Sequence, residues 1–338
     1  MSSFKVKVIE YEHDKSTLPR NFLRINISGS DVNYILVNTI RRLAISSVPC
    51  YAFYPDDINI EKNTSIFNND QMRLRLSNMP IVAPVHKLDL EVNDIIKIET
   101  DALSFDMESK KDYTQIEQEK ETRQSELINN LHMYIEAKNT GSVDMNVTTE
   151  DQFTKFYIDD KRIDNIYKRP ILIIKLKPGE EFKCLAVASK HIHIKHNIYS
   201  PCSVVSYDEI KNDEFELYLE SYGQIPEKDI LIMVCNIFIE KLNKLKEKIL
   251  IALNETTRDD VEISIENENH TMGNIISKIG QDHPKVEFWG YKIDNAFENI
   301  VVIRCKVAKD TTVTQVISDV TDKLSKLFNV IIKEISKI

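Results

Sequence analysis

The chain alternates between stretches with an apolar residue at every second position and stretches with apolar residues at helical spacing. Residues 4–11 and 22–28 show the first pattern and predict two paired strands. A helix is predicted next, because the following apolar residues recur three to four positions apart and share one face. Either Ser30 or Asp31 is expected to cap this helix, and Pro49 is expected to stop it. The predicted apolar face consists of Val32, Ile35, Leu36, Ile40, Leu43 and Ala44.

The middle of the chain is predicted to be rich in β-structure. Residues 51–100 suggest short strands and turns, and residues 131–137 alternate again between apolar and polar positions. Residues 106–126 are almost wholly polar, which indicates a solvated loop or an exposed helix. A more continuous apolar run at 170–176 predicts a buried strand followed by a turn.

A long helix is predicted from Pro226 to Leu253, after an alternating strand at 215–220. Its broad apolar face includes Val234 and Phe238. The helix also carries four lysines that are expected to face water: Lys241, Lys244, Lys246 and Lys248.

The same order of elements restarts near residue 258. An alternating strand at 261–265 leads to a helix, which is followed by strands at 286–293 and 300–307 and by a final helix. The two helices of this last segment carry apolar faces that include Ile275, Ile276, Ile279, Val320 and Leu324.

Two units with the same order of elements predict an α+β fold in which one chain forms an intrachain pseudo-dimer. The first unit is expected at 1–50 and 180–257, with a β-rich domain inserted at 51–179, and the second unit at 258–338. The helical faces of both units are expected to form one core. Its predicted interface residues are Ile35, Ile40, Leu43, Val234, Phe238, Ile275, Ile276, Ile279, Val320 and Leu324.

Composition narrows the possible functions. The net charge of −9 argues against autonomous DNA binding, because proteins that neutralise phosphates are usually basic over their footprint. Only 7 of 338 residues are glycine, and none are spaced as in nucleotide-binding loops. No apolar run approaches the roughly 20 residues that span a bilayer. Five dispersed cysteines indicate reduced thiols in a cytosol-like compartment.

Some residues could carry chemistry, but each has a simpler interpretation. The His191-x-His193-x-x-His196 set could bind a metal, although its alternation with isoleucines also fits an exposed strand. The pairs Asp56-Asp57 and Asp259-Asp260 are expected in turns, since general acid–base chemistry needs a cleft and a positioned partner. His270 is expected to cap or pack, and Trp289 to lie in a strand. No catalytic residue is predicted.

Several segments resemble one family of RNA polymerase subunits. Residues 38–49 (NTIRRLAISSVP) and 58–81 resemble the signature of the third-largest subunit of eukaryotic RNA polymerase II, its archaeal counterpart and the bacterial alpha amino-terminal domain. Residues 189–201 (SKHIHIKHNIYSP) resemble a later motif of the eukaryotic and archaeal members, and 215–226 resembles the strand before their last helix. The best-matching positions of the later motif are Lys195, His196, Tyr199 and Pro201.

The C-terminal segment resembles a different member of the same polymerases. Residues 267–293 are similar to the small eleventh subunit of RNA polymerase II and to the archaeal protein that corresponds to it. The two resemblances occur in the expected order and cover most of the chain except roughly 100–165. The positions that carry the second match are His270, Thr271, Gly273, Asn274, Val286, Phe288, Gly290 and Tyr291.

The resemblance implies a non-catalytic scaffold without a cofactor, present in one copy per polymerase. Its implied partners are the two largest, catalytic subunits and small accessory subunits. Fusion of the two subunits resembles an arrangement in large DNA viruses with cytoplasmic replication, so the expected location is a cytoplasmic replication compartment or the virion, or the nucleus if the protein is cellular. The implied docking residues are Arg41, Arg42, Lys195, His196 and Tyr199.

The chain also departs from these families. It has no cysteine between Cys50 and Cys184, so the zinc site that many relatives carry in the inserted domain is not expected. Residues 295–298 read Asn-Ala-Phe-Glu where the eleventh-subunit pattern has His-Pro-Leu-Glu. For Arg41 and Arg42 the alternative is solvated charge near a helix end. Two other functions stay open: an enzyme with an unfamiliar site, and a stand-alone dimerisation or nucleic-acid-binding module.

Overall fold

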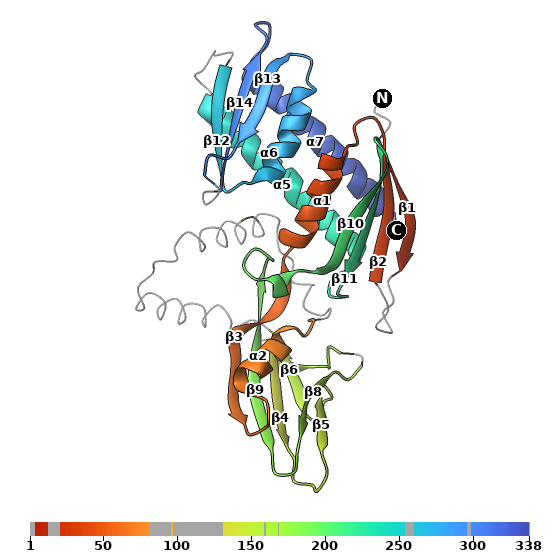
Figure 1. Cartoon of the computed structure of the whole chain (residues 1–338), viewed down its shortest axis with the longest axis vertical. Coiled ribbons are helices and arrows are strands. Elements are labelled where there is room, and N and C mark those ends of the chain that lie inside the picture. Colours follow the sequence, from red (N-terminus) through yellow and green to blue (C-terminus); the bar gives the residue numbers. More distant parts are fainter. Residues whose placement is uncertain are drawn as a thin grey trace, which may run out of the picture.

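The computed structural model describes residues 4–12, 21–81, 96, 131–158, 160–167, 169–253, 260–295 and 299–337. Within these ranges the chain forms a mixed α and β fold with several sheets (Figure 1). No described helix is both long enough and apolar enough to cross a membrane.

The N-terminal sheet is antiparallel and has the strand order β1-β2-β11-β10. Alternation along β2 turns Leu23, Ile25 and Ile27 toward the core, where they are buried. Two helices, α1 (Tyr34–Ser46) and α5 (Glu227–Leu253), pack against this sheet. Its strands are β1 (Lys5–Glu12), β2 (Asn21–Ser28), β10 (Cys202–Lys211) and β11 (Glu214–Ser221).

The C-terminal sheet repeats this plan with three strands in the order β12-β14-β13. In both sheets, the strand before the short helix lies beside the strand before the long helix: β2 beside β11, and β12 beside β14. The helices of this sheet are α6 (His270–Gln281) and α7 (Val313–Ile335). Its strands are β12 (Asp260–Glu266), β13 (Val286–Lys292) and β14 (Ile300–Val307).

The two sheets share one hydrophobic core. Helix α1 packs against α6, α5 packs against α7, and α7 also reaches β1 at the edge of the other sheet. One continuous cluster of buried residues includes side chains from both sheets and all four helices. Figure 1 shows the helices between the two sheets. The N- and C-terminal parts of the chain therefore do not form separately closed cores.

A β-rich part extends from the opposite end of the molecule (Figure 1). It contains a five-stranded sheet of order β3-β9-β4-β6-β7, a two-stranded sheet of β5 and β8, and helix α2 (Asn69–Ser77) against β3. These elements bury their own hydrophobic cluster. The strands are β3 (Cys50–Asn63), β4 (His132–Lys138), β5 (Met145–Thr148), β6 (Thr154–Ile158), β7 (Lys161–Ile163), β8 (Leu172–Leu176) and β9 (Glu181–His191).

The start of helix α1 differs from the prediction. Neither Ser30 nor Asp31 caps it: Asn33 is the N-cap residue, and its Oδ1 accepts a hydrogen bond from the Leu36 amide at 3.0 Å. At the other end the helix stops at Ser46, shortly before Pro49. Both predicted cap residues lie within three residues of the true cap, so the helix was predicted to begin two or three residues too early.

Part of the predicted series of short strands and turns at 51–100 is also wrong. The chain forms the single long strand β3 and then α2, whose start has a reciprocal capping box between Asn68 and Gln71. Helix α2 buries Met72, Leu76 and Ser77 and exposes mostly polar side chains together with Leu74, so its sequence carries a weak helical stripe. The polar segment 106–126 lies outside the described residues.

The expected limit of the β-rich insertion at residue 179 falls just before β9. Because β9 pairs with both β3 and β4, residues Glu181–His191 belong to the β-rich sheet. Its side chains Phe182, Cys184 and Ala186 are part of the β-rich cluster. The sheet pairing therefore extends this part of the chain to the end of β9.

Two glycines allow α6 to lie directly on β13. A Cβ at Gly280 would come within 2.4 Å of the Trp289 ring, and a Cβ at Gly273 would come within 2.6 Å of the Tyr291 ring. Trp289 is buried as a result. The two ring positions explain why only glycine fits this close approach of helix and strand.

Candidate subunit interfaces

The ten residues predicted to form an interface between the two units are all buried, and all lie in the one shared core. They lie in four helices that are separate segments of the chain: α1, α5, α6 and α7. The structure thus brings them together. Their role as an interface between two folding units stays a prediction.

Phe328 is an aromatic residue of this core that the sequence analysis did not single out. Its ring centroid lies 4.4 Å from that of Phe238, so α7 and α5 are joined by an aromatic pair. Phe328 follows Leu324 by four positions and hence lies on the same helical face. This helical spacing could have identified Phe328 as a core residue from the sequence.

Three ion pairs also link the two halves of the core. Lys246 of α5 lies 2.8 Å from Asp322 of α7. The turns before the two short helices are tied to the long helices of the opposite halves, each by one ion pair. These pairs are Lys323–Asp31 at 2.8 Å and Lys241–Glu268 at 3.3 Å.

Lys241 corrects the prediction that the lysines of the long helix face water. Its side chain is only 8% exposed, and that of its partner Glu268 is 16% exposed. Lys241 follows Phe238 by three positions and Val234 by seven, so it lies on the apolar face of α5. A buried charge of this kind needs a partner, and Glu268 supplies it.

Arg41 and Arg42 lie about one turn before the end of α1, not at its end, because the helix continues to Ser46. Arg41 Nε donates to Asn38 Oδ1 at 2.9 Å. Arg42 is exposed and lines a small cavity of about 140 Å³ where both halves meet. The other side chains of this cavity include Ser46, Ile194, Lys241, Glu268 and Thr271.

The segment after β9 is a turn rather than a continuing strand. β9 ends at His191, and the chain then turns into a short 3-10 helix, η3 (Asn197–Tyr199). The alternation had suggested that His191 and His193 share one strand face. His193 lies beyond the end of the strand, so the two side chains do not share a face. His196 Nδ1 accepts from the Ile198 amide at 3.3 Å and so caps η3.

Lys195 and Tyr199 have different surroundings. The Lys195 ammonium lies 2.8 Å from His191 Nε2 and 5.9 Å from the centre of the Tyr54 ring. The Tyr199 side chain is fully buried, with its hydroxyl 2.8 Å from Ser189 Oγ. The Tyr199 side chain therefore holds the turn in place, and its contact with a partner stays a prediction.

Lys190 adds a further cation beside this turn. Its ammonium lies 5.1 Å from the centre of the Tyr51 ring. Burial lowers the pKa of Lys190 to about 8, while the nearby Cys50 acts in the opposite direction. Lys190 and Lys195 make this turn locally basic on a chain whose net charge is −9.

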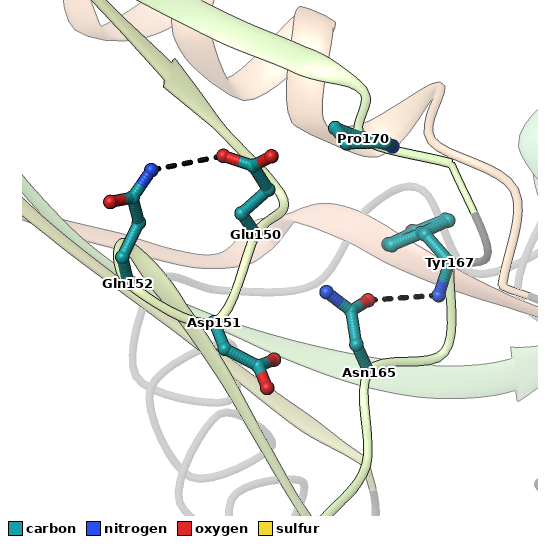
Figure 2. Close-up of a pocket in the computed structure, with 6 residues that line it drawn as sticks. All are labelled: Glu150, Asp151, Gln152, Asn165, Tyr167 and Pro170. Carbon is teal, nitrogen blue, oxygen red and sulfur yellow. Dashed lines mark hydrogen bonds between the residues drawn. The ribbon is translucent and has the colours of Figure 1, made fainter.

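The β-rich part has a hollow of about 500 Å³ lined by Glu150, Asp151, Gln152, Asn165, Tyr167 and Pro170 (Figure 2). The carboxylate of Glu150 accepts from Thr148 Oγ1 at 3.1 Å and from Gln152 Nε2 at 2.9 Å. Asn165 Oδ1 accepts from the Tyr167 amide at 2.9 Å. These hydrogen bonds hold the loops of the hollow together.

The remaining titratable candidates also have structural roles. Asp57 and Asp260 lie in strands β3 and β12 and not in the predicted turns. Asp57 Oδ2 accepts from Ser189 Oγ at 3.2 Å, and Asp260 forms two hydrogen bonds with the Arg304 guanidinium. Arg304 lowers the pKa of Asp260. His270 begins α6, where Asn269 is the N-cap residue, and its ring contacts Tyr291. Each of these groups stabilises local structure.

The five cysteine thiols are buried, and none of them forms a disulfide. Burial raises the pKa of Cys50, Cys184 and Cys305 to about 12, and raises that of Cys202 and Cys235 as well. Protonated thiols are poor nucleophiles and poor metal ligands. Among the described residues, no group of three or more His, Cys, Asp and Glu side chains is arranged to hold a metal ion.

Residues 260–334, which comprise the C-terminal sheet with α6 and nearly all of α7, match the RNA polymerase Rpb3/Rpb11 dimerisation domain. This half of the helix core is therefore similar to that dimerisation domain. Over 334 residues the chain is 25% identical to a protein of Acanthamoeba polyphaga mimivirus named as DNA directed RNA polymerase subunit R470, covering 96% of this chain and 91% of that protein.

Cellular relatives match shorter parts. Subunit 3 of RNA polymerases II, IV and V from Arabidopsis thaliana is 26% identical over 203 residues, which are 60% of this chain and 56% of the plant protein. Subunit RPAC2 of RNA polymerases I and III from Saccharomyces cerevisiae is 31% identical over 88 residues, or 25% of this chain and 62% of the yeast protein. The resemblance to RNA polymerase subunits of the Rpb3/Rpb11 type is thereby confirmed.

Proposed function

We propose that this chain is a non-catalytic assembly subunit of a DNA-dependent RNA polymerase and that it nucleates assembly of the two largest, catalytic subunits. One observation carries the proposal: a dimerisation domain of the Rpb3/Rpb11 type shares its core with an N-terminal sheet of matching strand order in the same chain. Relatives named as polymerase subunits support the same function.

The two sheets with their helices are the two halves of an intrachain pseudo-dimer, and the β-rich part is an insertion in the first half. Support comes from the matching strand order and from the pairing of short helix with short helix and long helix with long helix. The division is 4–49 with 192–253 for the first half, 50–191 for the insertion and 260–337 for the second half. The burial of all ten predicted interface residues in one cluster supports this arrangement.

Fusion changes how the platform forms. Two halves on one chain meet at an effective concentration of roughly mM or more, so pairing does not depend on the concentration of a second chain. The isolated chain is expected to be a monomer in solution and one copy is expected in each polymerase. Light scattering coupled to size exclusion tests this, and an obligate homodimer would contradict it.

The docking surface for a large partner comprises Arg42 and the basic turn with Lys195 and His196; Arg41 lies beside it on α1. Support comes from their exposure or partial exposure near one another, since Arg42 and Ile194 of the turn line the same cavity. Exposed cations at an interface rim set orientation and association rate. Tyr199 contributes by stabilising the turn through the hydrogen bond of its buried hydroxyl.

The deciding experiment is affinity purification of the native protein with identification of the chains that co-purify. Two very large polymerase subunits are expected, with smaller accessory subunits, in a cytoplasmic viral compartment or virion, or in the nucleus of a cellular source. Recovery of the chain alone, together with tight DNA binding that weakens steeply with salt, would instead favour a nucleic-acid-binding module.

Variants separate docking from folding. Arg42→Ala and Lys195→Ala are each expected to reduce recovery of the large subunits while leaving the thermal unfolding of the isolated chain unchanged. Lys211→Ala, at an exposed position of β10, is the matched control and should leave recovery unchanged. Equal recovery with all three variants would remove the basic turn from the interface.

A further inference from the structure

The two sheets that share the helix core end in four edge strands: β1, β10, β12 and β13. The pairing of β1, β10 and β13 with their neighbours is irregular, with breaks in register along each of them. In contrast, β12 pairs with β14 in unbroken register from Asp260 to Glu266. Bulges commonly keep edge strands from adding a further strand, and β12 has no such interruption.

Strand β12 occupies the position in its sheet that β2 occupies in the other, but its surroundings differ. β2 lies between β11 and β1, whereas β12 has β14 as its hydrogen-bonded neighbour within the described residues. β12 therefore lies at the outer edge of its sheet (Figure 1). The edge of β12 that faces away from β14 corresponds to the edge of β2 that pairs with β1 in the first sheet.

Burial of the inner side chains agrees with an uncovered edge. The inner residues of β2, which are Leu23, Ile25 and Ile27, are at most 1% exposed. On β12 the corresponding row is less covered: Ile263 is 7% exposed, Ile265 is 6% exposed, and Val261 is only partly buried. A further strand beside β12 would remove the remaining apolar surface of this row from water.

We propose that the free edge of β12 receives an extended segment of another polymerase subunit, which pairs with it as a fourth strand. The identity of the donor as a polymerase subunit rests on the proposed function, whereas the edge itself is a property of this chain. Backbone pairing would supply affinity, and alternate side chains would supply specificity, as in other cases of strand addition.

The side chains of β12 define the chemistry of that segment. Its outward row is exposed and consists of Asp260, Glu262, Ser264 and Glu266, so three of its four side chains are acidic. Within the same sheet, Arg304 pairs with Asp260 at 2.9 Å and Lys292 lies 3.7 Å from Glu262. On β1, the strand in the corresponding place of the first sheet, Lys5 and Lys7 face outward. Val6 between those lysines is buried, and Val8 after them is partly buried. The incoming strand should likewise alternate valine or isoleucine with lysine or arginine.

A second copy of this chain is a poor candidate for the same edge. Antiparallel pairing of β12 with another β12 would bring two acidic rows onto one face of the extended sheet. Like charges opposite one another on neighbouring strands are destabilising. The charge of β12 thus favours a basic partner strand over self-pairing.

The test uses the full chain and a labelled eight-residue peptide that alternates lysine and valine, blocked at both ends. Fluorescence anisotropy measures binding, and hydrogen exchange measures protection of the amides at 260–266. We expect binding with slower exchange in that segment. The same peptide with every backbone amide methylated should not bind, because it cannot pair with a strand edge. Unchanged exchange at 260–266, or equal binding of the methylated peptide, would overturn the proposal.

Charge reversal provides a second check. Glu262→Lys combined with Glu266→Lys is expected to weaken binding of the lysine–valine peptide by on the order of tenfold, and to favour a glutamate–valine peptide instead. The matched control reverses Asp208 and Glu209, two exposed acids on the irregular edge β10, and should leave binding unchanged. Equal losses in both variants would show that binding reports net charge rather than β12.

The assembled polymerase separates this inference from the proposed function. Exchange at 260–266 should be slower in the purified assembly than in the free chain at equal concentration. If the large subunits co-purify but exchange is the same, strand addition is wrong and the assembly role stands. If exchange slows with concentration in the isolated chain, a second copy is the occupant and the proposal fails. If polymerase subunits do not co-purify, the proposed function fails, and the peptide result decides the edge alone.

Discussion

Phe238 of α5 and Phe328 of α7 pack ring against ring, with centroids 4.4 Å apart and an interplanar angle of 33°. Both side chains are almost completely excluded from water. They join the long helix of the N-terminal half to the long helix of the C-terminal half. The pair therefore reports directly on the packing of the two halves.

Truncating either ring should destabilise the chain. Phe238→Ala and Phe328→Ala are each expected to lower the free energy of unfolding by about 3–5 kcal/mol, because each leaves a cavity in a close-packed core. In the double variant the two losses should differ from additivity by about 0.5–1.5 kcal/mol. Urea unfolding measures all four states of the cycle. Phe288→Ala, at a 52% exposed position, serves as the control; strictly additive losses would mean that the rings do not interact.

Charges placed on the two short helices test the shared core. Ile40 of α1 and Ile276 of α6 are buried in the same cluster. Ile40→Asp and Ile276→Asp should each cost about 4 kcal/mol or more, since a carboxylate would be buried without a partner. Thermal unfolding of the full chain measures this. Leu74→Asp on α2 is the control at a 64% exposed position, where little change is expected. A variant as stable as the parent at either core position would disprove the predicted burial there.

The free energy of unfolding should depend strongly on both members of the buried ion pair between Lys241 and Glu268. Lys241→Met leaves the Glu268 carboxylate largely buried without its cation, and a loss of about 3–5 kcal/mol is expected. Combining Lys241→Met with Glu268→Met should restore much of that stability, because no uncompensated charge is left behind. Denaturant titration of the parent, both single variants and the double variant measures the effect. A double variant as unstable as the sum of the singles would argue against a direct pair.

The lowered pKa of Lys190 predicts that the stability of the folded chain rises with pH. Its pKa is about 8 in the folded chain and near 10.5 when solvated, chiefly because of burial. Between these two values the unfolded chain binds more protons, so this lysine makes stability rise as the pH increases from about 8 to about 10.5. That gain is lost as the pH falls back to 8, below which the folded state must hold a partly buried charge.

Replacing that lysine should remove the effect. Lys190→Met is expected to be more stable than the parent at pH 7, and the difference should shrink as the pH rises toward 10.5. Urea unfolding at several pH values, with Lys5→Met as the exposed control, gives the comparison. A difference between Lys190→Met and the parent that stays constant over this range would show that Lys190 is not the titrating group.

The periodic spacing of apolar residues was enough to predict most elements of the helix core. The stripe containing Ile35, Ile40 and Leu43 formed a helix with that face buried, and so did the stripe containing Ile275, Ile276 and Ile279. Such patterns are strong because a helix must bury its apolar face somewhere. The restart near residue 258 also carried information, since β12 begins at Asp260.

Other features could not be read from spacing. Helix α2 has a weak apolar stripe, so its sequence resembles a polar loop, and only its capping box hinted at a helix. The turn after His191 kept the alternation of a strand although the backbone had left the sheet. Tyr199 carried a family motif that suggested contact with a partner, yet the fold turns its side chain inward. Local pattern does not specify the direction in which a turn points its side chains.

The sequence by itself determined which residues are apolar and how often they recur, and therefore which segments form the helices α1, α5, α6 and α7 and which face each one buries. Only the tertiary structure decided what those faces meet. The partnership of Lys241 with Glu268 and the contact of Phe238 with Phe328 depend on packing between segments distant in the chain. The physical reason is that burial drives a helix face out of water without direction, whereas the partner is chosen by shape and charge once all the elements are in place.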